Sequence, residues 1–238
     1  MKRSVVFLMC CALGGSGPSL IFASSPGNPL LNVGKGRLTV SAEWEHTNRT
    51  LDLDDESDVM SNRYWLKGTY GFSEWFDITG AVGGVDFDVS TAQDAGFRSF
   101  ESHHLTFGFS GGLKFRVAHN EKRNMTILAT VNGSHMESEN FVGSSPPSDL
   151  VWNEVQSTVA VMKGYGFAYP YVGASYSLVD GELNYGSSED FRDPGGLLLA
   201  GVDFSLPSRY MLSIEVNSRI GGTWDEISFC VGLSQGTK

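Results

Sequence analysis

Residues 104–117 contain the sequence feature that most constrains the fold, an unbroken alternation of apolar and polar positions. An alternation with period two is typical of a β-strand with different surroundings on its two faces. The stretch is longer than an ordinary strand of about 5–6 residues, whereas a tilted strand that crosses a bilayer needs roughly 9–11 residues. It therefore predicts a transmembrane strand whose apolar row comprises Leu105, Phe107, Phe109, Gly111, Leu113, Phe115 and Val117.

The N-terminal residues have the layout of a secretory signal peptide. A basic start at Met1, Lys2 and Arg3 precedes an apolar run over residues 5–13, and small residues follow at Ala23. Charge, apolar core and small-residue cleavage site in this order are typical of an export signal. We predict a signal peptide over residues 1–23, a periplasmic lead-in over 24–34 and one barrel domain over 35–238.

Charge and cysteine content narrow the possible functions. The chain has 27 acidic and 17 basic residues and a net charge of −10. Binding to nucleic acid depends on clustered Lys and Arg that neutralise phosphates, so we expect no nucleic-acid partner. Cys10 and Cys11 lie in the predicted leader, which leaves Cys230 as the one mature cysteine and excludes an internal disulfide. No cofactor motif is present, and we expect no cofactor.

Similar alternation recurs along the chain and predicts an all-β fold with about ten strands, within a range of 8–12. The phase of the third strand changes at Gly83 and Gly84, which predicts a β-bulge there. The predicted strands cover residues 37–46, 63–72, 76–88, 104–117, 125–135, 151–164, 168–179, 197–206, 210–220 and 226–233.

Short and long connections follow one another around the predicted barrel. The connections at 73–75, 119–124, 164–167 and 207–209 are short, whereas those at 47–62, 89–102, 136–150 and 180–196 are long. An even number of antiparallel strands with short periplasmic turns and long extracellular loops is typical of transmembrane β-barrels. The pattern predicts an antiparallel up-and-down transmembrane barrel.

A soluble exported barrel or sandwich is the alternative, because alternation does not say which face points inward. Three features favour the membrane arrangement. Closure of the barrel removes every exposed strand edge, which lipid cannot tolerate. The polar rows consist mostly of Gly, Ser and Thr with charges of both signs, which suits a crowded lumen. The apolar rows carry aromatic residues near the strand ends, as interfacial girdles do; these are Trp44, Tyr64, Tyr70, Phe72, Phe76, Phe115, Tyr165, Tyr176 and Tyr210.

The export leader, the alternating strands and the turn from Tyr70 to Phe76 resemble bacterial outer-membrane β-barrel proteins. The resemblance covers about residues 37–233 and is architectural. It implies a location in the bacterial outer membrane, contact with membrane lipid and lipopolysaccharide, and insertion by the barrel assembly machinery. The chain departs from the family at its last strand, which ends at Leu233 where an aromatic residue is usual.

The predicted inward rows contain charges of both signs. A barrel of this size is largely filled by side chains, so we interpret these residues as a salt-bridge network in the lumen. A narrow pore for small polar solutes is the alternative. The residues are Glu43, Glu45, Arg63, Lys67, Lys114, Arg116, Glu154, Asp203, Glu215 and Arg219.

A hydrolase is a third possibility. The predicted bulge would turn Asp86 and Asp88 inward, near His104, and carboxylates beside a histidine can activate water. This resembles omptin-type outer-membrane proteases in strand number and acid–histidine chemistry, although no omptin motif is present. Our main hypothesis is a non-enzymatic barrel with a structural or surface-interaction role through its long loops, its extracellular ligand being unknown.

An acidic segment in the first long loop could hold a hard cation through oxygen ligands. It lacks the glycine and the terminal glutamate of an EF-hand loop, so we interpret it as a solvated loop with no metal. The acidic residues are Asp52, Asp54, Asp55, Glu56 and Asp58.

Overall fold

The computed structural model describes residues 33–52, 56–91, 98–101, 105–140, 148–185, 188–220 and 227–236. The predicted signal peptide and nearly all of the lead-in lie outside the described residues. No helix in the described part is long and apolar enough to cross a membrane.

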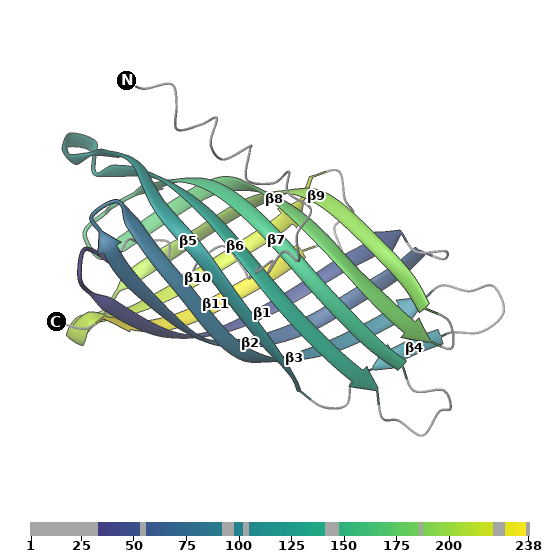
Figure 1. The fold of residues 1–238 in the computed structure, drawn as a ribbon. Helices are drawn as coiled ribbons and strands as arrows, with labels where there is room; N and C mark the ends of the chain where they lie inside the picture. Colours follow the sequence, from purple (N-terminus) through teal and green to yellow (C-terminus); the bar gives the residue numbers. More distant parts are fainter. Residues whose placement is uncertain are drawn as a thin grey trace.

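Antiparallel strands form one closed barrel (Figure 1). Its ladder runs β2-β1-β11-β10-β9-β8-β7-β6-β5-β3, and pairing of β2 with β3 closes it. The short strand β4 pairs with the last residues of β3, and β5 pairs with the earlier residues of β3. Strands β4 and β5 therefore occupy the same position in the barrel wall. The strands are β1 (Leu38–Asp52), β2 (Glu56–Ser73), β3 (Phe76–Thr91), β4 (Arg98–Glu101), β5 (Thr106–Asn120), β6 (Met125–Asn140), β7 (Ser148–Lys163), β8 (Ala168–Tyr185), β9 (Ser188–Ser205), β10 (Tyr210–Arg219) and β11 (Ile227–Gly236).

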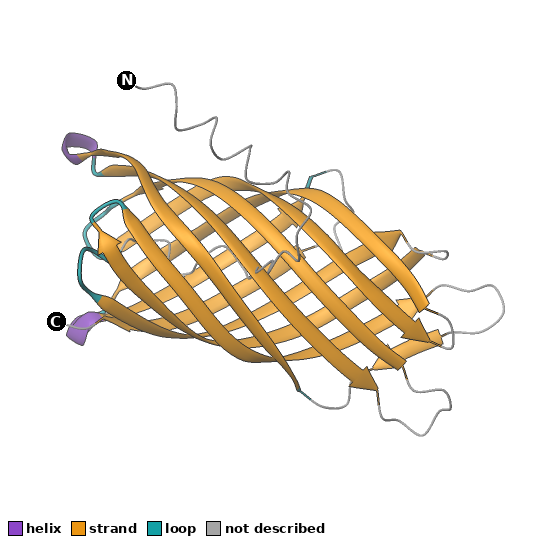
Figure 2. Cartoon of the chain, viewed as in Figure 1, coloured by secondary structure: helices purple, strands orange, loops and turns teal. Residues whose placement is uncertain are grey.

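The predicted fold class is confirmed: the described residues form a closed antiparallel barrel of ten strand positions. Two short turns, η1 (Glu121–Arg123) and η2 (Pro207–Arg209), lie at the same end as the C-terminus (Figure 2). Because short turns are periplasmic in such barrels, we assign this end to the periplasm and the opposite end to the cell surface.

An apolar belt surrounds the outside of the barrel. Large hydrophobic side chains on every long strand are exposed; Leu66, Val172 and Leu198, for example, are 58%, 62% and 57% exposed. In water this continuous surface would be unfavourable, but in a bilayer it contacts acyl chains. Exposed aromatic residues border the belt: Phe72, Tyr70, Tyr165, Phe167 and Tyr210 toward the periplasm, and Trp44, Tyr64, Phe107, Tyr176 and Phe229 on the opposite side. The chain therefore has the architecture and the lipid-facing surface of a bacterial outer-membrane barrel.

The strands are longer than predicted at the extracellular end. Residues 180–196 were predicted as a loop, but all of them except 186–187 belong to β8 and β9. Residues 47–62 were also predicted as a loop, yet β1 and β2 include all of them except 53–55. The barrel wall therefore continues beyond the apolar belt, and those two loops are short.

The polarity of the wall is inverted in this extracellular section. On β1, His46, Asn48 and Thr50 now lie on the outer face, while Leu51 points inward and is buried. The expectation of a polar lumen is therefore wrong at this end, where buried side chains form an upper apolar cluster. Its members are Leu51, Val59, Trp65, Ala81, Val85, Phe87, Met136, Leu150, Trp152, Val179 and Phe191.

The β-bulge predicted at Gly83 and Gly84 is wrong. Pairing of β3 with β2 and β5 continues without a shift through both residues. Gly83 keeps the inward phase, and a Cβ there would lie 2.6 Å from Cε3 of Trp65. Glycine is required because the Tyr64 backbone oxygen and the buried indole ring leave no room for a Cβ. Register shifts occur instead between Gly71 and Ser73 and between Arg116 and Ala118.

Candidate functional site

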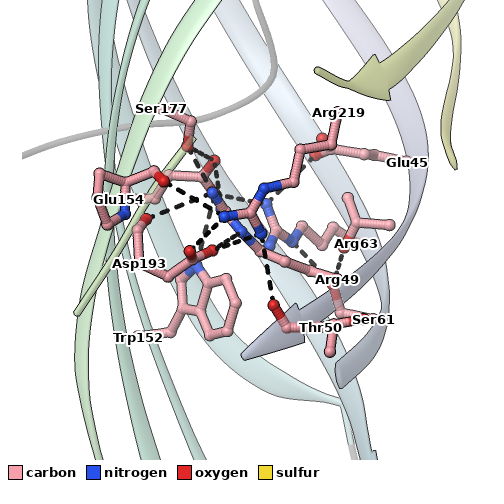
Figure 3. Close-up of polar contacts among 12 residues, drawn as sticks. Glu45, Arg49, Thr50, Ser61, Arg63, Trp152, Glu154, Ser177, Asp193 and Arg219 are labelled. Atoms are coloured by element: carbon pink, nitrogen blue, oxygen red, sulfur yellow. Dashed lines mark hydrogen bonds and ion pairs between the residues drawn. The ribbon is translucent and has the colours of Figure 1, made fainter. Parts of the chain in front are cut away.

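Six charged side chains meet in the lumen beside the upper apolar cluster (Figure 3). We call them the central ion network. Five strands contribute to it, so it connects opposite sides of the barrel. The members are Glu45 and Arg49 on β1, Arg63 on β2, Glu154 on β7, Asp193 on β9 and Arg219 on β10.

Asp193 accepts hydrogen bonds from two arginines. Arg49 Nε donates to its Oδ2 at 2.5 Å, and Arg219 Nη2 donates to its Oδ1 at 2.5 Å. Arg219 also contacts two backbone carbonyl oxygens, that of Thr50 at 3.4 Å and that of Pro194 at 3.3 Å. Charge-assisted bonds with this fork geometry are strong and directional. Asp193 thereby fixes β1, β9 and β10 relative to one another.

Arg63 occupies the other half of the network. Its Nη1 lies 3.1 Å from Glu154 Oε2 and 3.8 Å from Glu45 Oε2. Its guanidinium carbon is 5.7 Å from the centre of the Trp152 ring, in cation–π geometry. Ser177 Oγ donates to Glu154 Oε1 at 2.8 Å. The network combines three arginines with three carboxylates, so the buried charges offset one another.

The other predicted lumen charges form separate contacts nearer the periplasm. Lys67 Nζ and Glu43 Oε2 are 2.6 Å apart, and both side chains are 1% exposed. Tyr171 Oη donates to Glu215 Oε2 at 2.9 Å. Lys114 and Asp203 are buried on β5 and β9.

Arg116 lies at the bulge in β5. Its guanidinium carbon is 6.0 Å from the centre of the Trp75 ring.

Sequence reasoning missed Arg49 and Asp193, two of the six members of the central ion network. Both fall in segments that were predicted to be loops. The signal that could have found them is phase: Arg49 occupies an odd position on β1, as do Glu43 and Glu45 on the inward row.

A small cavity of about 40 Å³ adjoins the network. A cavity of this volume accommodates only a few water molecules. Its lining combines guanidinium, carboxylate, amide and apolar groups: Glu45, Thr47, Asn48, Arg49, Arg63, Trp152, Glu154, Gln156, Leu197, Asn217, Arg219 and Ser228. The described lumen is therefore filled mainly by its own side chains at this level.

The predicted catalytic arrangement is wrong for the two acids. Because β3 has no phase change at Gly83, Asp86 and Asp88 lie on its outer face, whereas Val85 and Phe87 point inward and are 0% exposed. His104 lies outside the described residues.

The predicted acidic loop is largely strand. Asp58 is exposed and accepts a hydrogen bond from Thr50 Oγ1 at 2.9 Å. Asp54 and Asp55, and the side chains of Asp52 and Glu56, lie outside the described part. Among the residues that the structure describes, no group of three or more His, Cys, Asp or Glu side chains could hold a metal ion.

Comparison with known proteins finds similarity at the level of architecture. No family model matches, and no curated protein matches. An outer membrane channel from Pseudomonas putida F1 is 12% identical, with a TM-score of 0.48 over 90% of this chain and 100% of that one. The translocator domain of the autotransporter NalP from Neisseria meningitidis is 9% identical, with a TM-score of 0.48 over 89% and 91% of the two chains. At these identities and TM-scores the similarity carries no information about activity.

Proposed function

We propose that this outer-membrane barrel is closed at rest and has a structural or surface-interaction role at its extracellular end. The observation that carries the proposal is the filled lumen. The upper apolar cluster occupies the extracellular half, with the Phe87 and Phe191 rings 5.6 and 5.7 Å from the Trp152 ring. The central ion network lies beside it, with the Arg63 guanidinium over the Trp152 ring. An apolar constriction resists wetting and therefore blocks ions.

The outer face beyond the apolar belt supplies the interaction surface. We call this surface the acidic collar. It is rigid because it is made of paired strands rather than loops. The exposed charges that define it are Asp58, Glu137, Asp149, Asp180, Asp190 and Arg192, five acids and one base.

The acidic collar suggests how the protein meets lipopolysaccharide. Both the collar and the lipid phosphates are negative, so direct contact is unfavourable. Divalent cations, which take several oxygen ligands, would bridge carboxylates to phosphates. We further propose that the barrel assembly machinery inserts the chain, as the outer-membrane architecture implies.

Bilayer conductance tests the closed state. Purified protein inserted into a planar bilayer should give no conductance steps. The double variant Trp152→Ala, Phe87→Ala should give steps, because it removes two large side chains from the upper apolar cluster. Val159→Ala, on the outer face of β7, is the matched control and should stay silent.

Steps from the wild-type protein would overturn the closed state and favour a narrow pore for small polar solutes. Silence of the double variant, with insertion verified by protease protection, would show that another part of the lumen is the barrier.

A further inference from the structure

The strands β10 and β11 are shorter at the extracellular end than their neighbours β1 and β9. The ladder between β1 and β11 reaches only His46 and Phe229, although β1 continues to Asp52. The ladder between β9 and β10 ends at Leu197 and Arg219, followed by one backbone bond from Ile220 N to the Gly196 oxygen, although β9 begins at Ser188. Residues 47–52 and 188–195 therefore extend beyond the paired parts of β10 and β11.

In the described part of the chain, no backbone ladder joins β1 to β9. We call the line along which residues 47–52 of β1 face residues 188–195 of β9 the seam.

Side chains hold the seam together. Arg49, from β1, reaches both the carboxylate of Asp193 and its backbone oxygen on β9, the latter at 3.4 Å. Arg219, from the top of β10, reaches Asp193 on one side and the Thr50 carbonyl oxygen of β1 on the other. Figure 3 shows Arg49 and Arg219 converging on Asp193. We call this set the Asp193 bridge.

The small cavity described above lies at the inner side of the seam. Asn48, Leu197 and Ser228 line it near the wall, and Glu45 and Glu154 line it toward the lumen. Asn217 Oδ1 also belongs to its lining residues, is buried, and has no hydrogen-bond partner. The cavity therefore offers both donors and acceptors to a small polar group.

We propose that the seam is a side entrance to the lumen and that the Asp193 bridge keeps it closed. The closed cavity has room only for water, and the open seam would admit small polar molecules with both donor and acceptor groups, since the lining combines arginines with carboxylates and amides. Residues 48 and 50 of β1 and 192 of β9 make the outer face of the seam polar, so it opens toward water and lipid headgroups. This route bypasses the upper apolar cluster. The side entrance is an inference beyond the closed resting state proposed above.

Cys230 provides the reporter. It is 1% exposed, lies on the inner face of β11 two residues from Ser228, and pairs with Glu45. The experiment uses the mature chain from residue 24, in which Cys230 is the one cysteine, reconstituted in lipid vesicles with a small water-soluble methanethiosulfonate reagent. Wild-type Cys230 should react slowly, and complete reaction after denaturation gives the reference. Asp193→Asn should raise the labelling rate by about tenfold or more, because it removes the charge that both arginines share.

Two further variants make the test specific. Arg219→Lys keeps the charge but loses the fork that spans two strands, and it should raise the rate by a smaller factor. Val172→Ala is the matched control, because Val172 is 62% exposed on the outer face of β8, away from the seam. Its labelling rate should equal that of the wild type.

The proposal is overturned if Asp193→Asn and Arg219→Lys, each shown to be folded by gel mobility, label at the wild-type rate. It is also overturned if Trp152→Ala alone opens access to Cys230 while the bridge variants do not, because solutes then enter through the extracellular mouth. If Asp193→Asn does not fold, Arg219→Lys decides the matter by the same comparison.

Discussion

Lys67 and Glu43 illustrate the energetics of charge inside the lumen. Both are removed from water and each is the other's counter-ion. Burying one charge without a partner is expensive, whereas an intact pair contributes little relative to apolar residues of similar size.

Lys67→Met should therefore destabilise the barrel by about 3–5 kcal/mol, because Glu43 remains buried without its partner. The double variant Lys67→Met, Glu43→Leu should be more stable than the single variant. Reversible urea unfolding in lipid vesicles measures both losses, and Lys163→Met, an exposed site, is the control. Additive losses in the double variant would contradict the pairing.

At the scale of the element, β1 explains what the sequence could and could not predict. Alternation over residues 38–46 has apolar residues outside and polar residues inside, as a membrane strand requires. Beyond His46 the outer face of β1 becomes polar because water replaces lipid there, while inside Thr47 and Arg49 are polar and only Leu51 is apolar. A reading that searches for a single polarity ends the strand at this point.

The same inversion accounts for the wrong β-bulge in β3. Ile78 and Val82 are apolar and outward, whereas Val85 and Phe87 are apolar and inward. In the sequence this change is indistinguishable from a shift of phase. It also explains the candidate site: Glu45, Arg63 and Glu154 were predicted as lumen charges because they lie on recognised strands, whereas Arg49 and Asp193 lie in the inverted section.

β8 provides a test of the boundary between lipid and water. Val172 is 62% exposed within the apolar belt, and Asp180 is exposed on the same outer face beyond it. Val172→Arg should cost up to about 2–4 kcal/mol, because a lipid-facing arginine is most unfavourable near the bilayer midplane. Asp180→Arg, the control, should cost almost nothing. Unfolding titrations in vesicles measure the difference, and equal costs would contradict the assigned position of the belt.

At the scale of the whole molecule, the described strands form a sheet that closes on itself. Pairing of β2 with β3 satisfies strand edges that lipid could not solvate. Opening the barrel therefore exposes unpaired backbone groups along two strands at once. The structure predicts a single cooperative unit that resists detergent.

Gel mobility in SDS checks this prediction. Outer-membrane protein loaded without heating should migrate as a compact species, and boiling should shift it to the mobility of the unfolded chain. A circularly closed ladder is required for the shift, so identical mobilities before and after heating would contradict the closed barrel.

The inverted polarity of the wall has a consequence for the response to temperature. Burial of the upper apolar cluster removes surface from water and gives unfolding a positive heat-capacity change. The apolar belt faces lipid in the folded state, so its contribution to the heat-capacity change of unfolding differs from that of the cluster. Cooling should therefore weaken the extracellular section first, so that the protein is most easily loosened at its outer end in the cold.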